Sequence, residues 1–236
     1  MTARAEELAL RLADVRQRLE RACDAAQRDP ASLVLIAVSK GWPVDDIAIV
    51  RDLGVVDFGE NRVDELLGKV SELHDLGITW HFIGQLQSKK AAAVGRTAQV
   101  VHSVDREALI APLGNGAQQA GRPVDVLIQV SLAGMSADQV GGRGGAEPEQ
   151  VEAVATLLAG APGLVLRGVM TLPPQDVPPV DAFAAIAEIS ARLRRQHPSA
   201  TAISAGMSSD VETAVAAGAT HVRIGSALFG QRTRVR

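Results

Sequence analysis

Apolar and polar positions follow two different periods along the chain. Near the N-terminus, four apolar residues are spaced by four, three and four positions: Leu8, Leu12, Val15 and Leu19. This spacing predicts one face of an amphipathic helix over residues 3–28, ending near Asp29 and Pro30. Short apolar runs then alternate with further helical patterns. The helical pattern at 61–76 is the clearest, because five apolar residues share one stripe: Val63, Leu66, Leu67, Val70 and Leu73.

Each short apolar run predicts a strand, and there are eight: 33–39, 55–58, 79–83, 99–103, 124–131, 164–169, 200–203 and 220–224. Helices are predicted between them, at 44–53, 61–76, 86–95, 105–120, 147–160, 179–197 and 208–218. Strands and helices in alternation indicate an α/β protein, a single (β/α)8 TIM barrel with an additional N-terminal helix. An open doubly wound sheet is the alternative, but no GxGxxG motif follows the first strand.

Composition limits the classes of function. The 236 residues are 47% apolar and 22% charged, which suits one sizeable core, so we expect a single domain over 1–236. A net charge of −3 and 3% aromatic residues disfavour a nucleic-acid binder, which needs a basic patch. Cys23 is the only cysteine, and its helical surroundings predict that it is buried. No run approaches the roughly 18 uncharged apolar residues of a membrane helix, so we expect a cytoplasmic protein without membrane contact.

Two glycine-serine turns follow neighbouring predicted strands, at the barrel end where ligands usually bind. They are SAGMSSD at 204–210 and IGSALFG at 224–230. Each offers a glycine for close backbone approach, then hydroxyls and free N–H groups at a helix start, which favour an anion. A capping box from Ser209 to Glu212 explains one such turn without any ligand. Two turns on adjacent strands favour a phosphate site.

Lys40 ends the apolar run LVLIAVS at 33–39. A lysine in such a place is usually solvated. In a closed barrel, however, the first strand pairs with the eighth, which brings Lys40 to the same rim as the two turns. An amine in a partly dry pocket near cations loses its proton more readily and can form a Schiff base with an aldehyde. A phosphate anchor with such a lysine suits pyridoxal 5′-phosphate, and it equally suits a sugar-phosphate aldolase.

Seven segments, in order along nearly the whole chain, match one family: AVSK (37–40), DFGENRVDE (57–65), WHFIGQLQSKK (80–90), VHSVDR (101–106), LIQVS (127–131), RGVM (167–170) and SAGMSSDVETAVAAGATHVRIGSALFG (204–230). By these segments the chain resembles the pyridoxal phosphate homeostasis proteins of the YggS/PROSC type, which have the barrel of the alanine racemase N-terminal domain. The chain departs from that pattern at 131–142, where the family often has a lysine and this sequence has none. Lys89 and Lys90 remain, either as phosphate-attracting groups or as a solvated helix start.

The resemblance implies that eight residues bind pyridoxal 5′-phosphate. Lys40 would form the covalent imine. Four residues would hold the phosphate, largely through backbone N–H groups: Met207, Ser208, Gly225 and Ser226. Arg223 would face the pyridine nitrogen, with a structural salt bridge as its alternative, and Asn61 and His81 would lie beside the ring. A hydrogen-bonded core position is the equal alternative for His81. We expect Glu60 to pair with a nearby cation. We expect no metal site, since the other histidines show no ligand spacing: His74, His102, His197 and His221.

Arg223 sets the chemistry that the resemblance implies. Arginine stays cationic and has no acceptor, so it leaves the ring nitrogen unprotonated and the cofactor a weak electron sink. Racemases of this barrel type add a tyrosine from a second domain, whereas this sequence has no tyrosine and no room for that domain. We therefore predict a non-catalytic, monomeric carrier that stores, buffers or delivers this vitamin B6 cofactor, meeting apo enzymes transiently. Two alternatives stay open: a weak amino-acid racemase or lysine-imine aldolase, and a cofactor sensor whose Gly-rich loop, 133–148, orders on binding.

Overall fold

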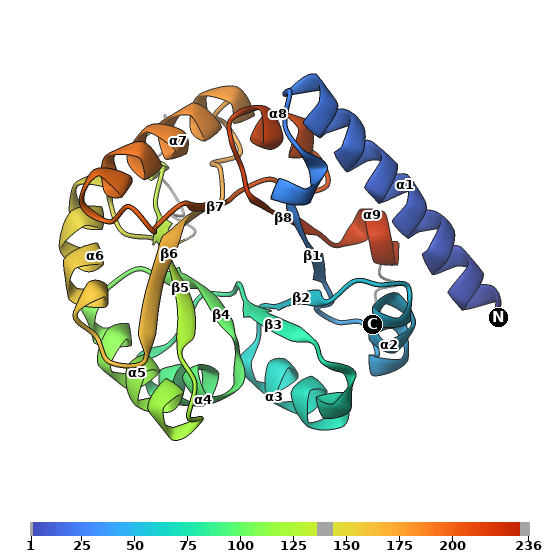
Figure 1. The fold of residues 1–236 in the computed structure, drawn as a ribbon, viewed down its shortest axis with the longest axis horizontal. Coiled ribbons are helices and arrows are strands. Elements are labelled where there is room, and N and C mark those ends of the chain that lie inside the picture. Colours follow the sequence, from blue (N-terminus) through green and yellow to red (C-terminus); the bar gives the residue numbers. More distant parts are fainter. Residues whose placement is uncertain (1, 136–143, 232–236) are drawn as a thin grey trace.

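Eight parallel strands close into a barrel in sequence order, and helices surround it (Figure 1). The computed structural model describes residues 2–135 and 144–231. The strands are β1 (Val34–Val38), β2 (Asp57–Glu60), β3 (Thr79–Phe82), β4 (Val100–Val104), β5 (Val124–Val130), β6 (Leu164–Thr171), β7 (Ala202–Ser204) and β8 (His221–Ile224). The predicted TIM barrel is confirmed. The open doubly wound sheet is wrong, because β1 pairs in parallel with β8, from Val34 opposite His221 to Ala37 opposite Ile224.

The helices form the outer layer of the barrel. They are α1 (Ala3–Ala25), α2 (Val44–Asp52), α3 (Val63–Glu72), α4 (Ser88–Thr97), α5 (Ile110–Gln119), α6 (Val151–Ala159), α7 (Pro179–Gln196), α8 (Val211–Ala216) and α9 (Ser226–Phe229). The one-turn α9 is absent from the predicted set, because four residues are too few to show a helical period. Across the ranges that the structure describes, no helix is long and apolar enough to span a membrane.

The N-terminal helix α1 lies outside the barrel, beside α8, α9 and α2 (Figure 1). Its predicted apolar face is buried: Leu8, Leu12, Val15 and Leu19 are all less than one tenth exposed. Cys23 is also fully buried, as predicted. Burial of this stripe against the outer helices stabilises the helix far more than its own propensity does.

Two predictions near the carboxyl end of the barrel need correction: the range of β2, and which residues of α3 face inward. β2 lies two residues further along the chain than the apolar run 55–58, and so includes Gly59 and Glu60. A Cβ at Gly59 would lie 3.0 Å from Cγ2 of Ile36, so the barrel interior is crowded there and favours glycine. In α3, Leu67 of the predicted stripe is 38% exposed, whereas Lys69 is only 6% exposed. The lysine takes the inner position because carboxylates face it.

Candidate functional site

A cavity of about 970 Å³ lies at the carboxyl ends of the strands. Its wall includes seven of the eight predicted site residues: Lys40, Asn61, Met207, Ser208, Arg223, Gly225 and Ser226. The pairing of β1 with β8 brings the N-terminal Lys40 to the C-terminal turn. The volume is at the upper end of the roughly 300–1,000 Å³ typical of small-molecule sites.

Arg223 reaches from β8 across β7 to β6. Its Nη1 donates to Oγ of Ser204 at 2.7 Å, and its Nη2 donates to the carbonyl of Thr171 at 2.9 Å. The residue is only 4% exposed, and this burial lowers the pKa of Arg223 to about 10, so the guanidinium stays charged at neutral pH. Both acceptors are neutral oxygens, so hydrogen bonds, not the salt bridge considered as an alternative, hold the side chain. A buried cation in a cavity wall favours an electron-rich ligand group.

His81 is the predicted site residue that lies elsewhere. It is 2% exposed and falls outside the cavity wall, in the barrel interior. Its Nε2 lies 2.9 Å from Oδ1 of Asp57, and its Nδ1 lies 2.9 Å from Nε2 of His102. Both ring nitrogens are therefore engaged by protein groups. The geometry agrees with the alternative of a hydrogen-bonded core histidine.

Contacts continue from His81 to the cavity. Nδ1 of His102 lies 2.9 Å from Oγ of Ser204, the hydroxyl that Arg223 also contacts. A line of five side chains thus crosses the barrel interior: Asp57, His81, His102, Ser204 and Arg223. Burial, reinforced by the neighbouring histidines and Arg223, lowers the pKa of His102 well below its usual range. Burial likewise lowers the pKa of His221 to about 4. The rings of His102 and His221 are therefore neutral at neutral pH, and both lie near the charged Arg223.

A buried ion pair contacts the backbone next to Lys40. The side chain of Lys40 itself is half-buried in the cavity wall. Nζ of Lys69 lies 2.6 Å from Oε1 of Glu60 and donates to the carbonyl of Ser39 at 2.8 Å. The Ser39 hydroxyl donates to the same Glu60 oxygen at 2.7 Å. Burial raises the pKa of Glu60, and Lys69 opposes that rise. The expectation that Glu60 pairs with a cation is confirmed, and that cation is Lys69.

The turn after β7 is close to α8. Gly206 has φ +92°, and a Cβ there would lie 2.6 Å from Cβ of Ala214, so glycine is required. The Met207 N–H donates to Oδ1 of Asp210 at 2.7 Å and is already engaged. Ser208 and Ser209 also line the cavity. The expected capping box is wrong, because α8 begins after Asp210 and Glu212 bonds instead to Arg18.

Trp42 is one of the cavity residues that sequence reasoning missed. Its ring stacks on Phe229, with centroids 5.7 Å apart. An aromatic residue two positions after the candidate lysine, in a chain with so few aromatics, was the available signal. Lys90 bonds to Asp64 at 2.7 Å, outside the cavity wall. Residues 136–143 of the loop considered for the sensor lie outside the described residues.

Comparisons with known proteins find relatives along nearly the whole chain. A family model described as alanine racemase, N-terminal domain, matches residues 10–233. The chain is 39% identical over 225 residues to the pyridoxal phosphate homeostasis protein of Pseudomonas aeruginosa, covering 95% of this chain and 96% of that protein. It is 36% identical to PipY of Synechococcus elongatus, whose structure was solved with PLP bound, at a TM-score of 0.80 and covering 94% of this chain and 100% of that one.

Alanine racemase of Corynebacterium glutamicum shares the fold at 16% identity, with a TM-score of 0.66 over 98% of this chain and 64% of its own. At this identity the likeness shows a shared fold alone. The matches to the two relatives at higher identity cover nearly the whole length of both this chain and the relative. The chain therefore belongs to the pyridoxal phosphate homeostasis proteins, within the wider family of the alanine racemase N-terminal domain.

Proposed function

We propose that this protein binds pyridoxal 5′-phosphate and acts in its homeostasis by storing, buffering or delivering the cofactor. One observation carries the proposal: an amine, a buried guanidinium and two serine turns line the same cavity. The name of the Pseudomonas aeruginosa relative and the bound PLP in PipY support it. The Lys40 amine condenses with the aldehyde, forming the C=N bond and releasing one water molecule.

The residues present fit each part of the ligand. Ser208 and Ser226, on adjacent turns, hold the phosphate together with Gly225. Met207 contributes through atoms other than its engaged N–H. Arg223 faces the pyridine nitrogen, and Asn61 flanks the ring. His81 acts behind Arg223, without touching the ligand.

The same arrangement favours holding the cofactor over catalysing with it. When bound, pyridoxal phosphate supplies an electron sink that is strong only if its ring nitrogen is protonated. Arg223 remains cationic at neutral pH and cannot accept that proton or share it, so the nitrogen opposite stays unprotonated. The sequence also contains no tyrosine to serve as a racemase acid. Both features favour a carrier, and we propose that it acts as a monomer and passes its cargo to apo enzymes.

An absorbance titration tests the proposal. Protein mixed with pyridoxal 5′-phosphate should develop an imine band near the edge of the visible range, and Lys40→Ala should abolish it. Lys90→Ala is the matched control, since its amine bonds to Asp64 outside the cavity. A band that survives in Lys40→Ala, or a wild-type protein that ignores the cofactor, contradicts cofactor binding at this site.

Turnover assays separate the carrier from the racemase or aldolase. The loaded protein is incubated with L- or D-alanine, and separately with sugar phosphates. We expect rates at the background level. Conversion that exceeds background and disappears in Lys40→Ala would show an enzyme and refute the non-catalytic role.

A further inference from the structure

The N-terminal helix α1 contacts both serine turns of the cavity from outside. Arg4, Arg11 and Arg18 recur every seven residues, which is about two helical turns, so they lie along one side of α1. Two of the three donate to backbone carbonyls of segments that adjoin the cavity wall. These contacts join residues separated by 190 and 225 positions in the chain.

Arg18 bonds to the turn after β7. Its Nη1 donates to the carbonyl of Ser208 at 2.6 Å, while Nε and Nη2 bond to the carboxylate of Glu212 in α8 at 2.5 and 2.6 Å. The C=O and N–H of a trans peptide point in opposite directions. A Ser208 carbonyl held on α1 therefore turns the N–H of Ser209 away from α1. Ser208 and Ser209 both line the cavity.

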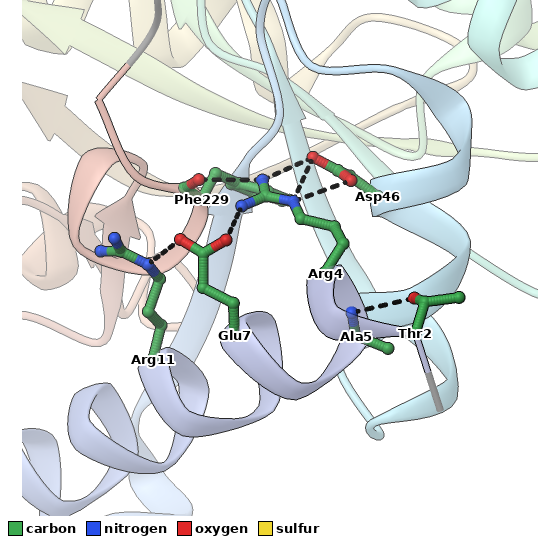
Figure 2. A network of polar contacts seen from close by, with 7 residues as sticks. All are labelled: Thr2, Arg4, Ala5, Glu7, Arg11, Asp46 and Phe229. Carbon is green, nitrogen blue, oxygen red and sulfur yellow. Dashed lines mark hydrogen bonds and ion pairs between the residues drawn. The ribbon is translucent and has the colours of Figure 1, made fainter.

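Arg4 bonds to the other turn, at the end of α9 (Figure 2). Its Nη2 donates to the carbonyl of Phe229 at 3.0 Å and lies 2.6 Å from Oδ2 of Asp46 in α2. A one-turn helix has almost no stability of its own, so its direction depends on tertiary contacts. A cation at the C-terminal carbonyl is favourable for the same helix.

Arg4 also covers the aromatic pair beside this turn. Its guanidinium carbon lies 5.1 Å from the ring centroid of Trp42, which stacks on Phe229. Trp42 lines the cavity. Arg11 and Arg4 both bond to Glu7 of the same helix (Figure 2), but among the described residues Arg11, unlike Arg4 and Arg18, donates to no backbone carbonyl.

We propose that α1 is a brace for phosphate recognition, in which Arg18 and Arg4 are positioning residues that hold the two serine turns in the geometry that receives the phosphate. The inference rests on the proposed function and deepens it. It assigns part of the ligand's phosphate affinity to side chains that do not touch the ligand. Loss of either arginine loosens one turn and leaves the Lys40 amine in place.

The test compares two aldehydes, pyridoxal 5′-phosphate and pyridoxal, because only the first carries the phosphate. Arg18→Met and Arg4→Met keep an unbranched stem and remove every donor. Arg11→Met is the control on the same side of the helix. We expect Arg18→Met to weaken Kd for pyridoxal 5′-phosphate about three- to tenfold, with less than about a twofold change for pyridoxal. Arg4→Met should weaken pyridoxal 5′-phosphate by a similar factor, and Arg11→Met should change neither ligand.

Three results overturn the brace. The first is an unchanged Kd for pyridoxal 5′-phosphate in both Arg18→Met and Arg4→Met. The second is an equal loss of affinity for the two aldehydes in Arg18→Met. The third is a loss of pyridoxal 5′-phosphate affinity in Arg11→Met as large as in the other two variants. Far-ultraviolet circular dichroism checks folding. If a methionine variant does not fold, Arg18→Lys or Arg4→Lys replaces it under the same criteria. A wild-type protein that binds neither aldehyde would refute the proposed function itself, whereas binding without any effect of Arg18 or Arg4 refutes the brace alone.

Discussion

Replacing Lys69 by methionine tests the effect of burial on an ion pair, because the chain also contains a pair of similar length at the surface. Lys69 has a second, less buried partner, Glu65, at 2.8 Å. Nζ of Lys69 lies 2.6 Å from Glu60, and Nζ of Lys90 lies 2.7 Å from Asp64. The distances are nearly equal. The exposures are not: the side chains of the first pair are 8% and 0% exposed, and those of the second are 37% and 77% exposed.

The magnitude follows from what each substitution leaves behind. In Lys69→Met, the Glu60 carboxylate stays buried without its cation, and Oε2 of Glu60 already has no hydrogen-bond partner among the described residues. Removing one partner of a buried pair costs about 3–5 kcal/mol of unfolding free energy. In Lys90→Met, water solvates Asp64, so the cost is about 0–1 kcal/mol. Lys69 also holds the carbonyl of Ser39 beside Lys40, so cofactor binding should weaken too.

The pH dependence gives an independent check. Burial raises the pKa of Glu60, and loss of Lys69 raises it further. Above the unfolded pKa of about 4.3, folded Lys69→Met then holds a proton that the unfolded chain has released. Its stability therefore falls as pH rises, and the loss relative to wild type should be smaller at pH 5 than at pH 8.

Urea unfolding of the wild type and both variants at the two pH values measures these differences. Glu60→Gln in the Lys69→Met background should recover most of the loss, because the fully buried carboxylate is then replaced by a neutral amide. Equal costs for Lys69→Met and Lys90→Met, or a loss that is the same at both pH values, would refute this account of the buried pair.

Two further predictions concern the barrel interior. Ser204→Ala should lower the unfolding free energy by about 1–3 kcal/mol and weaken cofactor binding, because buried Arg223 loses the acceptor of its Nη1. Urea unfolding and absorbance titration measure both effects, with the exposed Ser199→Ala as the control. A loss of stability and affinity no larger than that of the control would contradict the prediction. Because the pKa of His221 is about 4 when folded and about 6.5 when unfolded, the unfolded chain takes up the proton first, and up to about 3 kcal/mol of stability present above pH 6.5 should disappear by pH 4. His221→Gln should flatten that part of the stability profile, and an unchanged slope would show that the ring is not the cause.

Local patterns along the sequence determined the barrel and seven of the residues in the cavity wall. All eight strands overlap their predicted ranges, because alternating apolar runs report which short segments are buried. Lys40 and the two serine turns were predictable since each is a contiguous motif at a strand end, and strand order alone then places them at one rim. The apolar face of α1 followed from spacing in the same way.

Only the tertiary structure decided which polar residues face inward and what they meet. The pattern predicted that Leu67 faces inward, but Leu67 is exposed and Lys69 is buried instead, because Glu60 from another element compensates its charge. His81 turns to Asp57 and His102 and away from the cavity. Arg18 meets Ser208 across 190 residues of chain. Periodicity reports whether a position is buried, but the partner that makes a buried polar group stable comes from elsewhere in the chain and appears only when the barrel closes.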